Sequence, residues 1–223
     1  AEVATEVLNQ PMDRFLDFAL WQAMRDLKPY WLPALEQGEI DFGGNVEHLT
    51  FALKAVDAPQ LAPLLLKRIK EGKIDPQQAA SSIELITALG QPTEVYDLFT
   101  HVVSPQTELE PEQRARLLET LVAATKQRGL NVKGDMAPLT ELQRTDNVAL
   151  KAEVMRAAGA WKVGVMRTNV KQAALDVEES SSRVQKAAIE AMADYGDEEC
   201  RNVLLGVAIE DQDPEIRSHA IGQ

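Results

Sequence analysis

The chain has 223 residues, of which 45% are apolar and 5% are aromatic, and its formal net charge is −12. This charge repels nucleic-acid backbones and anionic membrane surfaces on average, so we expect a neutral or basic protein partner and no nucleic acid. No apolar run approaches the roughly 20 residues of a membrane span, which predicts no direct membrane insertion. The single cysteine, Cys200, excludes an internal disulfide.

The first nine residues, AEVATEVLN, predict one amphipathic helix with Val3, Val7 and Leu8 facing inward. After it, apolar patterning and turn residues predict a series of helical hairpins. The predicted first helices cover 12–27, 45–56, 76–89, 111–128, 147–160, 182–195 and 214 onward. The predicted second helices cover 29–37, 59–71, 92–103, 136–143, 163–177 and 198–209, and glycines at 38, 72, 90, 129 and 196 stand where helices should end.

An apolar pair recurs in the first helices every 32 to 35 residues. The seven copies are Ala19-Leu20, Ala52-Leu53, Leu85-Ile86, Thr120-Leu121, Val154-Met155, Ala188-Ile189 and Ala220-Ile221. A fixed period of this length is typical of solenoid proteins. We therefore expect one all-α domain over residues 1–223, a right-handed superhelix of about six hairpins with a partial repeat at each end. Because both ends fall inside repeats, we also expect a piece of a longer polypeptide.

The motifs favour one class of helical repeat over two others. The aromatic, Leu-Gly and Tyr positions of tetratricopeptide repeats do not recur, and the Thr-Pro-Leu-His turn of ankyrin repeats is absent. The segment Asp213 to Ile221 reads D-P-x-I-R-x-x-A-I, and Ser182 to Met192 agrees with it more weakly. Both resemble HEAT (armadillo-like) repeats. At the position that often links neighbouring copies stand Arg217, Gln185 and Lys151, which predict an imperfect charge ladder.

No local motif predicts catalysis or a metal site. The three histidines, His48, His101 and His219, lie in different repeats without Cys, Asp or Glu at metal-ligand spacing. Cys200 lacks the second cysteine and the histidine of a haem-attachment motif, so a buried structural thiol is expected. We expect a non-catalytic chain that binds no cofactor of its own.

Acidic residues gather at the turns of the last repeats, and two interpretations remain open. Stacked in register, they would form an acidic docking strip for a basic partner, with Glu178, Glu179, Asp197 and Glu198 as interface candidates. Alternatively, these carboxylates stand where they do because helix N-termini favour negative charge.

Seven of the eleven aromatic residues fall between Phe15 and Phe51. If they are exposed, Trp21, Tyr30 and Trp31 are the best candidates for a protein interface, because Trp and Tyr are enriched at binding hot spots. Two alternatives are a thicker core, in which a turn from Pro29 to Pro33 packs over the first helix, and a pocket for a small ligand or haem.

Three motifs carry a family resemblance. QPMDRFLDFALW starts at Gln10, PYWLPAL starts at Pro29, and GEIDFGGNVEHLTFALKAV starts at Gly38. Over about the first 105 residues the chain resembles the HEAT-repeat region of the haem-binding CxxCH proteins of planctomycetes, which are described as putative membrane-bound dehydrogenases.

The resemblance implies an exported, multidomain parent with a dehydrogenase-like domain before the repeats and a cytochrome c-like domain after them. It implies haem c elsewhere in that parent, because no CxxCH occurs here. The chain would then space and orient these flanking domains in the periplasm or another extracytoplasmic compartment. From the residues alone, a free-standing adaptor for a basic protein, in the cytoplasm or outside it, is also open.

Overall fold

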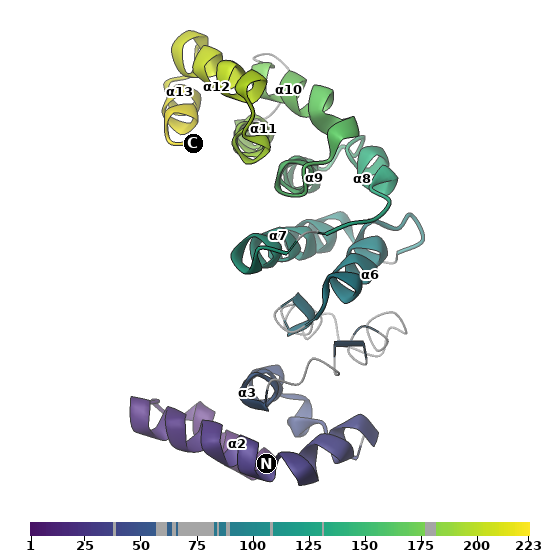
Figure 1. Ribbon diagram of the computed structural model, residues 1–223, viewed down its shortest axis with the longest axis vertical. Helices are drawn as coiled ribbons and strands as arrows, with labels where there is room; N and C mark the ends of the chain where they lie inside the picture. The colour runs from purple at the N-terminus through teal and green to yellow at the C-terminus, as the bar shows by residue number, and fades with distance from the viewer. Residues whose placement is uncertain are drawn as a thin grey trace. The chain divides into compact units, whose positions relative to one another are not determined.

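The structure is a computed structural model that describes residues 1–37, 39–56, 62–63, 66, 83, 85–87, 90–107, 109–130, 132–176 and 182–223. Every regular element within these ranges is helical, which confirms the all-α prediction (Figure 1). Contacts divide the chain into two compact units, Ala1–Val95 and Tyr96–Gln223, which are described in turn. The predicted helices 59–71 and 76–89, which belong to two different hairpins, lie largely outside the described residues, as do Gly38 and Gly72.

Unit 1 is built around one long helix. Its elements are α1 (Glu2–Thr5), the 3₁₀ helix η1 (Glu6–Asn9), α2 (Arg14–Gln37), the 3₁₀ helix η2 (Phe42–Gly44) and α3 (Val46–Val56). Helix α3 packs against α1 and α2, and it begins where predicted because the Asn45 Oδ1 accepts hydrogen bonds from the backbone N–H groups of Glu47 and His48.

The first nine residues differ from the prediction. They form α1 followed by η1 instead of one helix, and Val3, which we expected to face inward, is 85% exposed. Val7 and Leu8 are half-buried. The Glu2 Oε1 accepts the Phe42 N–H at 2.7 Å, so α1 is fixed to the 3₁₀ turn by a polar contact.

Helix α2 is the main correction to the predicted elements. The sequence predicts two helices, 12–27 and 29–37, because each proline removes a helical hydrogen bond at a cost of about 3 kcal/mol. The structure instead has one helix of 24 residues with Pro29 and Pro33 inside it. Burial explains its continuity, because the side chains after Pro29 that pack into the core continue the buried face begun by Leu20 and Met24. The buried residues of α2 are Leu20, Met24, Trp31, Leu32 and Leu35.

Helix α6 (Pro92–Val103) crosses the boundary between the two units. The helices described within unit 2 are α7 (Pro111–Arg128), α8 (Ala137–Leu142), α9 (Val148–Ala160), the 3₁₀ helix η4 (Gly164–Met166), α10 (Arg167–Leu175), α11 (Ser182–Tyr195), α12 (Glu198–Glu210) and α13 (Pro214–Ile221). The bounds of α7, α8, α9, α11 and α12 agree with the predicted helices to within one residue at each end.

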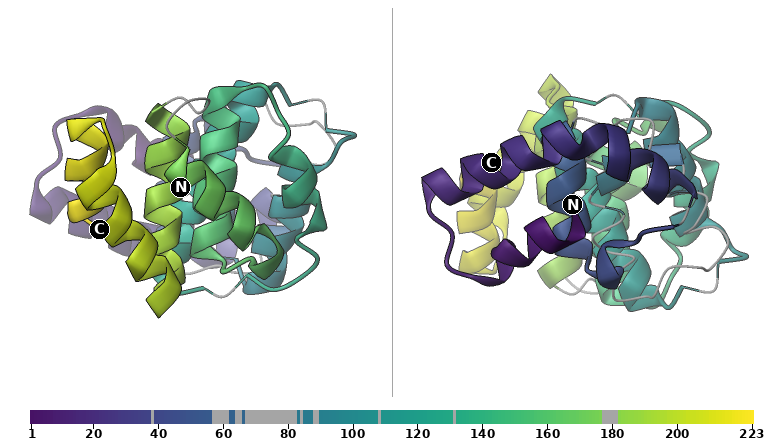
Figure 2. Two further views of the ribbon diagram at one scale, coloured as in Figure 1. Left: turned by 90° about the horizontal axis from the view of Figure 1, so that it is seen from above. Right: turned by 90° about the horizontal axis from the view of Figure 1, so that it is seen from below.

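The helices of unit 2 pack in two rows. Helix α9 lies between α7 and α11, and α11 also contacts α13, while α10 packs against α11 and α12 on the other side (Figure 1; Figure 2, left). Several helices of unit 2 begin at a local signal: Asn147, Asp197 and Asp213 cap α9, α12 and α13 through their side chains. Gly129, with φ of 62°, ends α7 in the left-handed conformation.

Candidate functional site

The exposed surface of α2 is the first candidate, because large aromatic side chains stand in solvent on it. Phe15 is 72% exposed, Phe18 63% and Tyr30 77%. Trp21 is 38% exposed and lies under the Arg25 guanidinium, 4.4 Å from the ring centroid. Isolated exposed aromatic residues are ordinary, but several on one helix indicate an interaction surface.

Trp31 does not belong to this surface. It is 3% exposed, its Nε1 donates a hydrogen bond to the Met24 carbonyl at 2.9 Å, and its ring packs edge-on against Phe42 at 5.5 Å. The expectation of an interface at Trp31 is therefore corrected, and this residue supports the alternative of a thicker core. Burial of Trp31 is favourable because it removes a large apolar area from water while the indole N–H keeps a hydrogen-bond partner.

Trp21 and Tyr30 cannot line one pocket. They are nine residues apart on a continuous helix, which places them about 180° apart around its axis. A pocket for a small ligand or haem requires side chains that converge. The arrangement of α2 therefore disfavours the ligand-pocket interpretation.

A second candidate is a set of ion pairs between the first helices of the hairpins of unit 2, which we call the charge ladder. Its pairs are Lys126–Asp194 (2.7 Å), Arg156–Glu190 (2.5 Å) and Lys186–Glu215 (3.1 Å). These contacts connect α7 to α11, α9 to α11, and α11 to α13. The ladder thus crosses four helices of the stack.

Glu153 is the most buried acid beside the ladder, with its side chain 2% exposed. Its Oε1 accepts a hydrogen bond from Arg156 at 2.6 Å and lies 3.6 Å from Arg183. Its Oε2 has no hydrogen-bond partner among the described residues. Burial raises the pKa of the Glu153 carboxyl above its ordinary value, and the two arginines oppose that rise.

A third cluster surrounds the start of α12. Arg167 of α10 forms an ion pair with Asp197, which also caps α12 by accepting the Cys200 N–H at 3.0 Å. The Arg167 hydrogen bond, followed by that backbone bond, lowers the pKa of Asp197 to about 2. Burial raises the pKa of the Cys200 thiol, which is fully enclosed as the sequence predicted.

Tyr195 ties α11 to the loop before α10. Its hydroxyl donates a 2.7 Å hydrogen bond to the Val163 carbonyl, and its ring lies 5.7 Å from the Arg167 guanidinium. Burial raises the pKa of Tyr195 to about 12. This residue therefore has a structural role in joining two hairpins.

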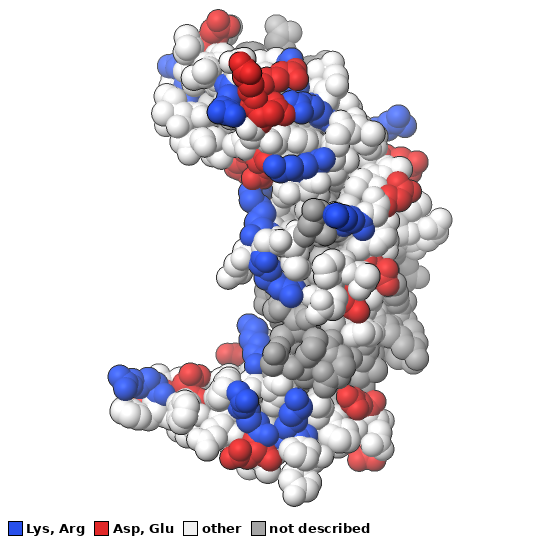
Figure 3. All heavy atoms as spheres, in the orientation of Figure 1, with Lys and Arg blue, Asp and Glu red and all other residues white. Residues whose placement is uncertain are grey.

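The acidic strip is less negative than the sequence indicates. Asp197 pairs with Arg167, and Glu199 accepts a 2.8 Å hydrogen bond from Lys171. On the face drawn in Figure 3, basic and acidic side chains alternate around α12. Glu198 is exposed, whereas Glu178 and Glu179 lie outside the described residues. The helix N-terminus interpretation accounts for Asp197 and for Asp213, because both cap helices.

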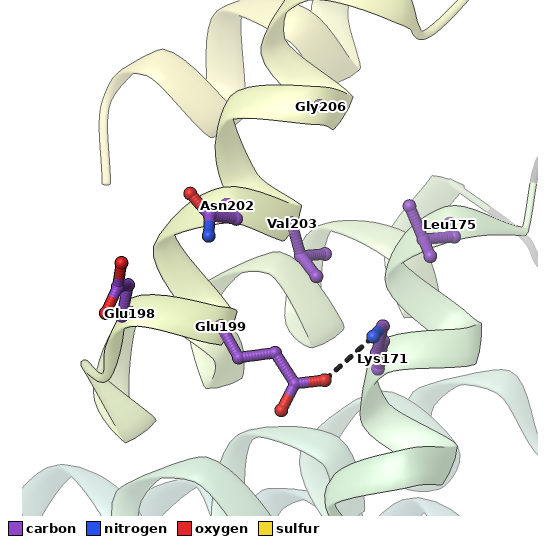
Figure 4. A pocket seen from close by; sticks show the side chains of 7 residues that line it. All are labelled: Lys171, Leu175, Glu198, Glu199, Asn202, Val203 and Gly206. Carbon is purple, nitrogen blue, oxygen red and sulfur yellow. Dashed lines mark hydrogen bonds and ion pairs between the residues drawn. The ribbon is translucent and has the colours of Figure 1, made fainter.

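A groove lies between α10 and α12. Lys171 and Leu175 line one side, and Glu198, Glu199, Asn202, Val203 and Gly206 line the other (Figure 4). The Lys171 ammonium points across the groove to Glu199, so these two charges neutralise each other. The described residues contain no group of three His, Cys, Asp or Glu that could hold a metal ion. Among them there is also no helix of the length and apolarity that crossing a membrane requires.

The predicted linking position makes links of hydrogen bonds instead of a charge ladder. Gln185 donates to the Ala174 carbonyl of α10, in the preceding hairpin, and to Asp211, at the junction before α13. Arg217 donates to the carbonyls of Asp211 and Gln212 at the same junction. The ladder residues Arg156 and Glu190 were missed. The signal was present, because opposite charges stand 34 residues apart, which is one period of the repeat.

Comparison of the chain with protein-family models, with curated proteins and with solved structures found no match.

Proposed function

We propose that this chain is a non-catalytic scaffold, a HEAT-like solenoid of helical hairpins that holds protein partners at a fixed separation. The observation that carries the proposal is the charge ladder of unit 2, in which Arg156 and Glu190 join α9 to α11 at 2.5 Å. A stack of hairpins keeps its two ends at a constant separation when the packing between each pair of neighbouring hairpins is fixed.

Two kinds of contact in unit 2 fix the packing between neighbouring hairpins. Gly159 of α9 and Ala191 of α11 allow these two helices to approach closely, and charged side chains on the same helices form the Arg156–Glu190 pair of the ladder. An isolated exposed ion pair contributes about 0–1 kcal/mol, so single pairs would add little stiffness. Arg156 pairs with both Glu153 and Glu190, and Glu153 also lies 3.6 Å from Arg183, so these four charges form a network between α9 and α11.

The partners proposed are the flanking domains of a larger redox protein. The resemblance of about the first 105 residues to the HEAT-repeat region of planctomycete haem-binding CxxCH proteins supports a dehydrogenase-like neighbour and a cytochrome c-like neighbour. Haem c would then belong to the latter domain, and the location would be extracytoplasmic. The exposed aromatic residues Phe15, Phe18 and Trp21 would supply contact area for such a neighbour.

Pulsed electron-spin distance measurements test the scaffold proposal in unit 2. Spin labels are attached at two exposed positions, Arg116→Cys on α7 and Ser218→Cys on α13, while the buried native Cys200 stays unlabelled. We expect one narrow distance distribution. Arg156→Ala removes two ion pairs of α9 and is expected to broaden it.

The matched control is Arg201→Ala, an exposed arginine of α12 that donates to the Gly196 carbonyl at 3.4 Å and is not part of the ladder. This variant is expected to leave the distribution narrow. A distribution that is already broad in the unsubstituted chain would overturn the scaffold proposal.

A further inference from the structure

We propose that Glu153 is a proton-operated switch that sets how tightly Arg156 joins α9 to α11. In its ionised state Glu153 shares the Arg156 guanidinium with Glu190. Once protonated, Glu153 leaves that guanidinium to Glu190 alone, and the link between the two helices tightens. The proposal concerns the regulation of the scaffold proposed above, and it rests on the scaffold function for its role in the molecule.

Arg156 lies between two carboxylates that belong to different helices. Its Nη1 donates to the Glu153 Oε1 at 2.6 Å within α9, and its Nε donates to the Glu190 Oε2 at 2.5 Å on α11. Only the second of these contacts joins neighbouring hairpins. The first contact competes with it, because the donors of one guanidinium form a rigid planar fork that must serve both acceptors.

Burial is the feature of Glu153 that favours proton uptake. Its side chain is 2% exposed, whereas the side chain of Glu190 is 28% exposed. The Glu153 Oε2 is buried and has no hydrogen-bond partner among the described residues. Leaving a buried oxygen without a partner costs more free energy in a carboxylate than in a neutral carboxyl. The raised pKa of Glu153, which burial causes, agrees with this geometry.

Charged groups from three helices act on the Glu153 carboxyl. Arg156 of α9 and Arg183 of α11 oppose proton uptake, and Glu119 of α7 favours it. Helices α8 and α10 also pack against α9, and no charged side chain of their described residues is among the groups that shift the pKa of Glu153. Arg183 is 53% exposed and lies 3.6 Å from the Glu153 Oε1, so losing this contact on protonation weakens the packing of α9 on α11 very little.

Proton uptake by Glu153 changes the balance between the two acceptors of Arg156. A hydrogen bond to a neutral carboxyl is about half as strong as one to a carboxylate, so the attraction of Glu153 for the guanidinium weakens while that of Glu190 persists. Arg156 already contacts both side chains, so the guanidinium can turn toward Glu190 without any movement of the helices. Acidification therefore strengthens the contact between these two hairpins.

A double-mutant cycle on Arg156 and Glu190 in the whole chain measures this link. Arg156→Ala, Glu190→Ala and the double variant are unfolded in urea at neutral pH and at lower pH values down to 4.5. The coupling between the two substitutions, expressed as an equilibrium constant, is expected to rise at least about threefold as the pH falls. In a Glu153→Gln background, where residue 153 cannot ionise, the coupling is expected to have the larger value at neutral pH already.

The Lys126–Asp194 pair is the matched control, because it joins α7 to α11 at 2.7 Å and neither residue is among the groups that act on Glu153. Its coupling is expected to be unaffected by Glu153→Gln. His219, whose Nε2 lies 3.1 Å from the Glu190 Oε1, is present in both backgrounds, so its titration affects both equally. A coupling between Arg156 and Glu190 that does not rise on acidification, or that rises equally with Glu153→Gln, would overturn the proposal.

Glu190→Gln supplies a second measurement that keeps the shape of the side chain and leaves Arg156 in place. At neutral pH its unfolding constant is expected to increase at least about threefold more in the Glu153→Gln background than in the unsubstituted chain. Equal losses in the two backgrounds would overturn the switch. The spin-label distances at neutral pH test the scaffold separately. A broad distance distribution with a rising coupling would overturn the scaffold alone, and a narrow distribution with a constant coupling would overturn the switch alone.

Discussion

Gly159 of α9 faces Ala191 of α11 so closely that a Cβ atom on Gly159 would lie 2.6 Å from the Ala191 Cβ. We predict that Gly159→Ala destabilises the chain, although alanine in a helix is ordinarily about 1 kcal/mol better than glycine. Overpacking costs about 1–3 kcal/mol, so a net loss of roughly 1–2 kcal/mol is expected in urea unfolding.

Gly206 is the matched control for this prediction. It also lies inside a helix, α12, but a Cβ there would meet no atom within 4 Å. Gly206→Ala is expected to stabilise the chain by up to about 1 kcal/mol. Equal effects at both glycines would contradict the close contact between α9 and α11.

The local signals of the sequence were sufficient for most of unit 2. The bounds of α9, α11 and α12 follow from apolar periodicity and from capping residues such as Asn147 and Asp197, whose hydrogen bonds reach only three residues along the chain. Gly129 and Gly196 take positive φ values where helices were predicted to end. These features depend on neighbours in sequence, so they can be recognised without a structure.

The predictions from sequence failed where contacts between residues far apart in the chain determine the structure. The continuity of α2 through Pro29 depends on burying Trp31 against Phe42, and the local rule for proline gives the opposite result. The aromatic surface was therefore only partly predicted, with Trp21 and Tyr30 exposed but Trp31 in the core. The residues of the charge ladder were missed because the two partners of each pair stand on different helices. They meet only when the hairpins stack.

Alanine substitutions of the adjacent residues Tyr30 and Trp31 test directly whether the first is exposed and the second is buried. Trp31→Ala is expected to destabilise unit 1 by about 3–5 kcal/mol, because it leaves a cavity and removes the hydrogen bond to Met24. Tyr30→Ala is expected to change stability by less than about 0.5 kcal/mol. Thermal unfolding of both variants distinguishes them, and a large loss with Tyr30→Ala would show that this residue is buried.

The burial of Glu153 predicts a dependence of stability on pH. Its folded-state pKa lies above the ordinary value of 4.5, so the folded chain binds this proton more tightly than the unfolded chain does. The ionised carboxylate therefore lowers stability above the folded pKa, and this loss is relieved as the pH falls through that value toward 4.5.

Urea unfolding of Glu153→Gln at several pH values measures this contribution. As the pH is lowered from neutral toward 4.5, the unsubstituted chain is expected to gain stability relative to the variant, whose side chain does not titrate. Parallel pH curves for the two chains would show that Arg156 fully offsets the burial of Glu153.

The lowered pKa of Asp197 predicts the opposite dependence of stability on pH. Its pKa is lowered from 3.8 to about 2, so the stability that it contributes is present above 3.8 and is lost as the pH falls through about 2. Asp197→Asn keeps a side-chain cap on α12 but removes the ion pair with Arg167. We expect a lower melting temperature at neutral pH and a smaller loss on acidification than in the unsubstituted chain.

Asp197→Ala removes both the cap and the ion pair, so its melting temperature is expected to fall below that of Asp197→Asn. Calorimetry between about pH 7 and pH 2 follows both variants. Identical melting temperatures for the Asn and Ala variants would contradict the capping role of Asp197.

The central claim is the proposed scaffold role, which requires unit 2 to hold its helices at one separation, and single-molecule energy transfer tests it most directly. Dyes are attached at Arg116→Cys in α7 and at Gln223→Cys after α13, both exposed positions of unit 2, with the buried Cys200 unlabelled. The account predicts one narrow transfer-efficiency population. A broad or multiple distribution in the folded chain would contradict it, because a scaffold must hold its two ends at one separation.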